Sequence, residues 1–326
     1  MNVGHENLGH GLLYTSDDDG CIKQICAKTH RKLKNLRSLH REPIYATCSS
    51  HDGKFFATSD SEGRIVLYDG QTGEVSHDFG VRHEGQIDVM TFDKSGHFFF
   101  TGGADGQLKK WSAYKKKLVK DYQKAHGDAN VTALVTTKDV LFSADTVGGI
   151  KAWNVHDRED RSEAGKYRIE YLASLYQHPR GISAIAISNN CEFLFTADEG
   201  GYLKQWDITD ILKGNIELVK NYGQVFYESV TGIVATPDHS FVYLSSERGT
   251  IKKIDILKME CVDTHLRVME CSISSIALSL NGDRMWIVDE QGSLKLWETA
   301  KDPTEFETKK IHYNTRLNTM AYLRNE

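Results

Sequence analysis

The chain has 326 residues and a formal net charge of −5, so it offers no overall positive charge that would attract nucleic acid. Apolar residues make up 40% and charged residues 26%, as in an ordinary soluble globular protein. No apolar run reaches the length of about 18 residues that a membrane-spanning helix needs. A chain of this length favours two domains unless it is built from repeats.

The first residues, MNVGHENLGHGLLYTSDDDG, lack the basic segment and the long apolar segment of a secretory signal. The six cysteines include no C-x-x-C pair and follow no regular spacing. We therefore expect reduced, mostly buried thiols in an intracellular protein, cytoplasmic or nuclear. A disulfide framework and a zinc site are not expected.

One short pattern recurs along the whole chain: an apolar run, an acidic turn that ends in glycine, and an alternating run that ends in a large apolar residue. In chain order the seven copies are LLYTSDDDGCIKQI, FFATSDSEGRIVLY, FFFTGGADGQLKKW, LFSADTVGGIKAW, FLFTADEGGYLKQW, VYLSSERGTIKKI and MWIVDEQGSLKLW. Their glycines are Gly20, Gly63, Gly106, Gly148, Gly201, Gly249 and Gly292. This regular spacing of 42 to 53 residues indicates a repeat architecture.

Each copy predicts a β-hairpin, because the acidic turn supplies side-chain caps and its glycine allows a positive φ. Runs such as Phe98-Phe99-Phe100 are apolar on successive residues, so both faces of these strands must be covered. Sheets stacked radially against neighbouring sheets meet that demand. A more polar outer strand follows each hairpin, for example 116–122.

A further short strand precedes each hairpin from the second to the seventh, and one more follows the seventh. These predicted inner strands are 44–49, 87–92, 131–136, 182–188, 230–236, 273–279 and 317–323. The first hairpin has no inner strand before it, and the last inner strand has no hairpin after it. We therefore predict that 317–323 pairs with 12–15 and closes the ring, which removes an open sheet edge.

The repeats resemble the WD-repeat (WD40) propeller family, in which each repeat carries His, Ser or Thr, Asp and Trp at set spacing. The third repeat has this set in His83, Thr101, Asp105 and Trp111, with steps of 18, 4 and 6. The resemblance implies an all-β, seven-bladed β-propeller, with a single domain over residues 1–326. Its N-terminal blade is then completed by the inner strand 317–323.

Other repeats keep the family set with changes. The second has His40, Thr58, Glu62 and Tyr68. The fifth has His178, Thr196 and Trp206, with Gly200 in the place of Asp, and the fourth has His126, Ser143 and Trp153, with Val147 in that place. Across the ring closure, His312 is expected to join Thr15 and Asp19, with Ile25 in place of Trp. Repeats six and seven have no matching His.

His83, Thr101 and Asp105 could also be read as a Thr-His-Asp catalytic triad. The same trio recurs in altered form in other repeats, and a catalytic site seldom occurs several times in one domain. We therefore predict a buried structural hydrogen-bond network. The 14 histidines include no H-x-H or HExxH pattern, so no catalytic residue, metal or cofactor is expected.

The resemblance implies that partners bind at the end of the ring where the hairpin turns and the loops before the inner strands emerge, here called the wide face. The candidate contact residues there are Asp18, Tyr45, Asp88, Glu199, Glu247, Glu290 and Arg316. Five are acidic, and the Arg cluster that phosphopeptide binding needs is missing. We therefore expect this face to bind a Lys/Arg-containing segment, with Tyr45 as an aromatic contact. The alternative is that acidic turns merely suit turn chemistry and solubility.

The most favoured function is a non-catalytic protein–protein interaction scaffold, or a subunit of a multiprotein complex. Its partners would be other proteins, while membrane and nucleic acid are not expected. The two longer connections, 157–168 and 208–222, offer further places for contact. The alternative is an enzyme with its active site at the mouth of the central channel.

Overall fold

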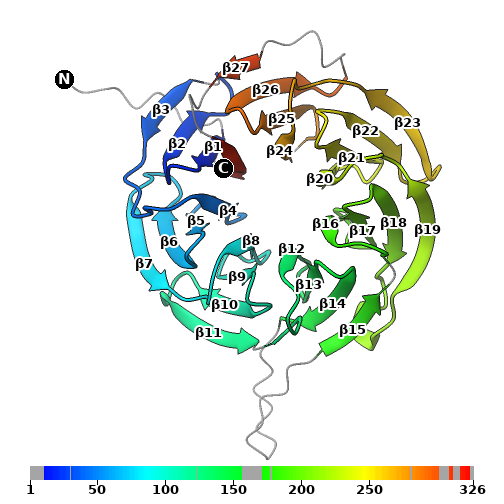
Figure 1. Cartoon of the computed structure of the whole chain (residues 1–326), viewed down its shortest axis with the longest axis horizontal. Coiled ribbons are helices and arrows are strands. Elements are labelled where there is room, and N and C mark those ends of the chain that lie inside the picture. The colour runs from blue at the N-terminus through cyan, green and yellow to red at the C-terminus, as the bar shows by residue number, and fades with distance from the viewer. Residues whose placement is uncertain are drawn as a thin grey trace, which may run out of the picture.

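The computed structural model describes residues 11–29, 31–122, 124–155, 171–176, 178–279, 281–300, 308–310 and 316–323. These residues form seven four-stranded antiparallel sheets set around a central axis, so the chain is the predicted seven-bladed β-propeller (Figure 1). Blade 1 contains β28 and β1–β3, and blades 2 to 7 each contain four consecutive strands from β4 to β27.

Each sheet has four strands, named here from the axis outward as the inner, second, third and outer strand. The inner strands are β4 (Ile44–Ser49), β8 (Ile87–Phe92), β12 (Val131–Thr136), β16 (Ile182–Ile187), β20 (Val230–Ala235), β24 (Ile273–Leu278) and β28 (Leu317–Leu323). The second strands are β1 (Leu12–Asp17), β5 (Phe55–Asp60), β9 (Phe98–Gly103), β13 (Val140–Asp145), β17 (Phe193–Asp198), β21 (Phe241–Ser246) and β25 (Arg284–Asp289). All seven predicted inner strands are thus present, within one residue of the expected bounds.

The third and outer strands complete each sheet. The third strands are β2 (Ile22–Cys26), β6 (Arg64–Asp69), β10 (Leu108–Ser112), β14 (Gly149–Asn154), β18 (Tyr202–Asp207), β22 (Ile251–Asp255) and β26 (Ser293–Glu298). The outer strands are β3 (Lys32–Asn35), β7 (Val75–Val81), β11 (Lys117–Tyr122), β15 (Tyr171–Tyr176), β19 (Glu217–Gln224), β23 (Glu260–His265) and β27 (Thr308–Lys310). A short 3-10 helix, η1 (Ile211–Lys213), precedes β19.

The ring closes as the sequence predicts. Strand β28 pairs antiparallel with β1, from Leu12 opposite Leu323 to Thr15 opposite Met320. On one side of β28, Leu317 and Met320 pack in one cluster with Trp286 of blade 7. On the other side, the Thr319 and Thr47 hydroxyls lie 3.1 Å apart, which joins β28 to blade 2. The last strand therefore touches three blades at once.

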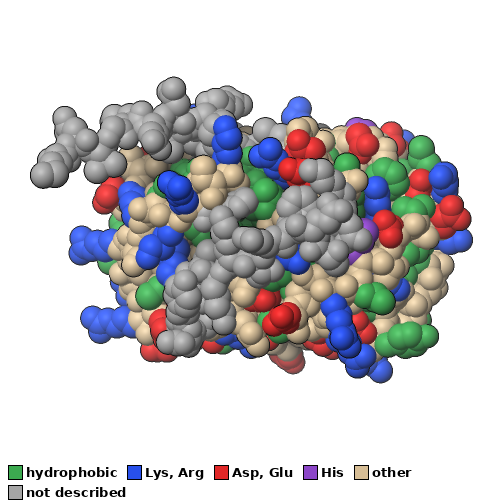
Figure 2. Space-filling view, turned by 90° about the horizontal axis from the view of Figure 1, so that it is seen from above, with side chains coloured by type: hydrophobic (Ala, Val, Ile, Leu, Met, Phe, Trp, Pro, Cys, Tyr) green, Lys and Arg blue, Asp and Glu red, His purple; other side chains and the backbone are tan. Residues whose placement is uncertain are grey.

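The hydrophobic core lies between the blades. Every residue of β1 and of β13 is buried, as expected for strands covered on both faces. In the core between blades 2 and 3, the rings of Phe79 and Trp111 meet edge to face with centroids 5.2 Å apart. The outer strands are much more exposed, and all four residues of β3 face solvent. On the side of the ring shown in Figure 2, basic and acidic side chains are interspersed.

The seven hairpin glycines all have positive φ, from 67° at Gly106 to 84° at Gly148. At Gly201 a Cβ atom would lie 2.1 Å from the Phe226 carbonyl oxygen, so only glycine fits beneath the connecting loop. The position of the glycine in each repeat is therefore fixed by backbone geometry as well as by packing.

All six cysteines are free, but only Cys48 is buried, so the expectation of mostly buried thiols is wrong. Within the described ranges, no helix is long and apolar enough to span a membrane. The charged connection 157–168 lies outside the described residues.

Candidate functional site

Four histidines lie in the loops just before β4, β8, β12 and β16, and their side chains are 0% exposed. Each Nε2 contacts a hydroxyl oxygen: His40–Thr58 at 2.7 Å, His83–Thr101 at 2.7 Å, His126–Ser143 at 2.7 Å and His178–Thr196 at 2.8 Å. Each Nδ1 contacts a carboxylate oxygen: His40–Asp60 at 2.7 Å, His83–Asp105 at 2.9 Å, His126–Asp145 at 2.6 Å and His178–Asp198 at 3.1 Å. Each trio ties a connecting loop to the hairpin of its blade.

A tryptophan sets the direction of this network in three blades. The indole N–H can only donate, and it donates to the same hydroxyl: Trp111 to Thr101 at 3.0 Å, Trp153 to Ser143 at 2.8 Å and Trp206 to Thr196 at 2.9 Å. The hydroxyl hydrogen is then directed at Nε2 of the histidine, and Nδ1–H donates to the aspartate. The imidazole is buried and each of its nitrogens has a partner, so each trio forms a buried hydrogen-bond network.

The acidic member of three trios differs from the prediction. Asp60, Asp145 and Asp198 fill this role, so the assignment of Glu62 is wrong, and so are the apparent gaps at Val147 and Gly200. Each of these aspartates is the last residue of its second strand. The carboxylate also caps the turn, as when Asp60 Oδ1 accepts from the Glu62 and Arg64 amides at 3.1 and 2.9 Å.

Blade 3 is the exception, and it explains the error. The equivalent strand-end residue is Gly103, where a Cβ atom would lie only 2.1 Å from the Gln86 carbonyl oxygen. No side chain fits there, and the carboxylate comes instead from Asp105, two residues further on. A template taken from this repeat therefore places the acid two residues too late in the other three.

Two further predicted members complete this picture. Tyr68 stands where blades 3, 4 and 5 have Trp; its ring is buried 5.7 Å from that of Phe56, and burial raises the pKa of its hydroxyl to about 12. The trio predicted for blade 1 depends on His312, which lies outside the described residues. Asp17 caps the turn of this blade, since its Oδ1 accepts from the Cys21 amide at 2.8 Å.

Blades 6 and 7 join loop to hairpin with other side chains. Buried Leu244 and Ile287 replace the hydroxyl residue. In blade 6 the Ser246 hydroxyl donates to Glu228 of the loop at 3.1 Å. In blade 7 burial, together with the hydrogen bond to Asp289, raises the pKa of the Cys271 thiol to about 11. The contact between loop and turn is thus kept while its chemistry changes.

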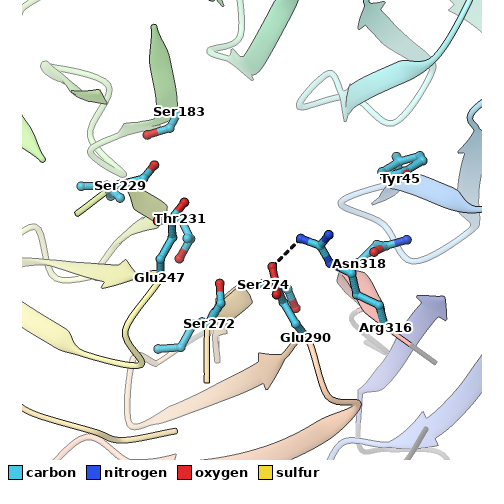
Figure 3. A pocket seen from close by; sticks show the side chains of 12 residues that line it. Tyr45, Ser183, Ser229, Thr231, Glu247, Ser272, Ser274, Glu290, Arg316 and Asn318 are labelled. Atoms are coloured by element: carbon cyan, nitrogen blue, oxygen red, sulfur yellow. Dashed lines mark hydrogen bonds and ion pairs between the residues drawn. The ribbon is translucent and has the colours of Figure 1, made fainter. Parts of the chain in front are cut away.

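A cavity of about 280 Å³ opens at the centre of the wide face, among the first residues of inner strands from blades 5, 6, 7, 1 and 2. Four of the seven predicted contact residues line it: Tyr45, Glu247, Glu290 and Arg316. Figure 3 shows Glu247 on one side, Tyr45 across the opening, and an ion pair between Arg316 and Glu290. The other lining side chains are mainly hydroxyls: Ser183, Ser229, Thr231, Ser272 and Ser274, with Asn318 beside them.

The remaining three predicted residues do not line this cavity. Asp18 lies at its edge, where its carboxylate accepts from the Asn318 amide at 2.8 Å. Asp88 accepts from Gln86 at 2.5 Å and is partly buried, which raises the pKa of its carboxyl group. Glu199 is exposed on the turn between β17 and β18. The predicted set is therefore one cluster of four with three residues around it.

Three segments of the chain, residues 32–69, 76–112 and 169–207, match the family model described as WD domain, G-beta repeat. They end in the third strands of blades 2, 3 and 5. In these three blades the chain carries WD40 repeats. In these three blades the Thr stands 18 positions after the His, whereas in blade 4 Ser143 stands 17 positions after His126. The family model thus matches blades that keep the step of 18.

Several curated proteins are similar to this WD-repeat propeller. Actin-interacting protein 1 of Drosophila melanogaster is 21% identical over 301 residues, which cover 89% of this chain and 46% of that protein. WD repeat-containing protein 1 of Gallus gallus is 24% identical over 60% of this chain and 31% of that protein. For transducin beta-like protein 3 of Bos taurus the identity is 21%, over 81% of this chain and 34% of that protein. The propeller spans less than half the length of each of these relatives.

A solved structure shows the same fold. The crystal structure of the computationally designed Ika8 protein matches with a TM-score of 0.67 and 21% sequence identity. The match covers 95% of this chain and 86% of that chain. At this identity the likeness concerns the arrangement of the blades.

Two kinds of residue on the wide face were not among the predicted contact residues. The hydroxyl side chains that line the cavity flank the first apolar residue of an inner strand, as Tyr45 does; the same positional rule places them on the wide face, but the prediction kept only charged and aromatic residues. Tyr227 is 90% exposed in the loop before β20, directly after buried Phe226. In the sequence, the sign of Tyr227 was a second aromatic residue directly after Phe226, in a loop where one aromatic side chain suffices to cover the turn.

Proposed function

We propose that this WD-repeat propeller is a non-catalytic scaffold that holds other proteins, and that the cavity on its wide face docks a Lys/Arg-containing segment. The observation that carries the proposal is the placement of two carboxylates, Glu247 and Glu290, with aromatic Tyr45 around one opening of about 280 Å³. These three residues come from blades 6, 7 and 2, so they form one site only in the closed ring.

Charge supports a basic partner. The side chains of Glu199 and Glu247 are exposed, and neither has a hydrogen-bond partner among the described residues. Surface carboxylates of this kind attract cationic segments and raise the rate of encounter, more strongly at low salt. Among the described residues that line the cavity, Arg316 is the single basic one, and it is already paired with Glu290.

Shape and polarity support a peptide segment. The hydroxyl groups of Ser183, Ser229 and Ser272 can each donate and accept hydrogen bonds, which suits the N–H and C=O groups of an extended chain. Tyr45 offers an aromatic face for a cation, an interaction of about 0.5–1 kcal/mol at exposed sites. Tyr227 adds an exposed aromatic ring on the wide face, where its loop is anchored to the neighbouring turn by the Val225 amide, 2.8 Å from the Gly201 oxygen.

The names of the relatives support the scaffold half of the proposal. Among them, actin-interacting protein 1 is named for interacting with another protein, actin. This chain would share that class of function, with partners of its own.

The test is capture of partners from the native cells with the tagged chain, beside a variant carrying Glu199→Lys, Glu247→Lys and Glu290→Lys. We expect a stoichiometric protein partner for the unmodified chain and a loss of about tenfold or more in affinity for the variant at low salt. The bound partner is identified by mass spectrometry, and its affinity is then measured by calorimetry with the purified proteins.

The matched control carries Glu74→Lys, Glu217→Lys and Glu260→Lys, which make the same change in net charge on exposed residues away from the wide face. If the control loses the partner equally, net charge and not the cavity governs binding. If the partner is kept by both variants, the scaffold proposal stands but the acidic docking site is wrong.

A further inference from the structure

The side chain of Arg316 is held in the proposed docking cavity by the closure of the ring. Arg316 immediately precedes β28, and its carbonyl oxygen accepts from the Asp18 amide at 3.1 Å. The next residue, Leu317, donates its amide to the Glu290 carbonyl at 3.3 Å. With the peptide group between Arg316 and Leu317 held at its carbonyl and at its amide, the Arg316 guanidinium reaches the Glu290 carboxylate inside the cavity (Figure 3).

The two carboxylates of the cavity are thus in different states. Glu290 already holds a guanidinium, while Glu247 has no side-chain partner among the described residues. The Arg316 and Glu290 side chains remain 56% and 34% exposed. Ion pairs this exposed to solvent are weak and readily exchanged, because water screens the attraction and the free ions stay hydrated.

We infer that Arg316 caps the docking site from within: in the free protein it occupies the position on Glu290 that an Arg or Lys of the partner takes when bound. This inference rests on the docking function proposed above. The partner's cation must displace Arg316 from Glu290, and Arg316 then contributes a repulsive positive charge at the same opening. The cap therefore lowers affinity for isolated basic side chains and favours segments that also use Glu247 and Tyr45.

Two other roles for Arg316 predict different results. If Arg316 itself bound an acidic group of the partner, its removal would weaken binding. If it served only to latch the ring, its removal would lower stability without changing affinity. The backbone hydrogen bonds of Asp18 and Leu317 already hold this segment, so we expect Arg316→Gln to shift the melting temperature by no more than about 3 °C.

The experiment measures binding of a fluorescein-labelled peptide with three arginines separated by alanines, by fluorescence anisotropy at low salt. The full chain is compared with Arg316→Gln, Glu290→Gln and the double variant. We expect Arg316→Gln to bind about three- to fivefold more tightly, which corresponds to the upper range of an exposed ion pair. In the Glu290→Gln background the same change gives a smaller gain, since the cap has lost its seat. Lys220→Gln, on the outer strand β19, controls for the lost positive charge.

The outcomes separate the two proposals. If the peptide binds the unmodified chain and Arg316→Gln binds equally or more weakly, the cap is refuted while docking stands. If neither protein binds the peptide, the docking proposal fails and the cap fails with it. If Lys220→Gln tightens binding as much as Arg316→Gln, the gain comes from net charge and the cap is again refuted.

Discussion

Blades 2 to 5 and blades 6 and 7 build the same sheet with different internal chemistry. In the first group a buried His joins a hydroxyl to an aspartate, as His126 joins Ser143 to Asp145. In blades 6 and 7 no such His is present, and the hydroxyl position is filled by buried Leu244 and Ile287. The cavity carboxylates, Glu247 and Glu290, both come from these two altered blades.

The comparison shows how one repeat serves two purposes. In blades 2 to 5 the buried His, hydroxyl and Asp groups of the loop and hairpin satisfy one another, which fixes the loop on its blade. In blades 6 and 7 apolar packing takes over part of that work. The acidic side chains of their turns are then directed at the opening on the wide face (Figure 3).

The largest expected effect concerns the ring that both groups share. Ending the chain before Leu317 removes β28, which pairs with β1 and packs against blades 7 and 2. We expect loss of cooperative unfolding or a fall in melting temperature of more than about 10 °C, because each blade depends on its neighbours. Circular dichroism on heating provides the measurement, and a chain ended after Leu323 serves as the control. A truncated chain that melts like the control would refute the role of the closure.

The next effect separates the two groups of blades. His126→Ala leaves the buried Asp145 carboxylate and Ser143 hydroxyl without their shared partner, so we expect a loss of about 3 kcal/mol in the free energy of unfolding. Cys271→Ala removes one partly exposed contact to Asp289, with an expected loss below about 1 kcal/mol. Urea unfolding of both variants checks this difference, and equal losses would show that the histidine trio adds no special stability.

The smallest effect is the dependence of stability on pH. Burial lowers the pKa of His178 below 6.5 and outweighs the opposing hydrogen bond to Asp198. Burial alone would raise the pKa of Asp145, but hydrogen bonds from His126 and from backbone amides hold it below 3.8. Both groups bind protons more weakly in the folded chain, so stability is greatest above pH 6.5 and falls as the pH is lowered.

This pH dependence can be assigned to His178. The fall begins below about pH 6.5, with a slope of at most about 1.4 kcal/mol per pH unit for one group. It steepens near pH 4, because the Asp145 carboxylate takes up a proton more readily in the unfolded chain than in the folded one. We expect His178→Gln to have a lower urea midpoint at every pH. Its free energy of unfolding should change less steeply with pH between about pH 6.5 and pH 5. An unchanged slope in this variant would show that other groups cause the effect.

Much of the fold could be predicted because its signals are local. Strand order, the positive-φ glycines and the inner strands follow from short patterns repeated seven times, and each copy supports the reading of the others. The acid of each trio was harder to assign. A shift of two residues, from Glu62 to Asp60, depends on how close the Gly103 backbone lies to Gln86 in the one repeat taken as a template.

By itself the sequence determined the seven hairpins, the pairing of the last strand with the first, and the positions at which side chains reach the wide face. These properties depend on residue period, turn chemistry and the need to cover sheet edges, which act over a few residues. Only the tertiary structure decided that Tyr45, Glu247 and Glu290 share one cavity and that Arg316 is seated on Glu290. These residues are far apart in the chain, and the ring brings them together at its axis because every blade directs its inner strand there (Figure 1).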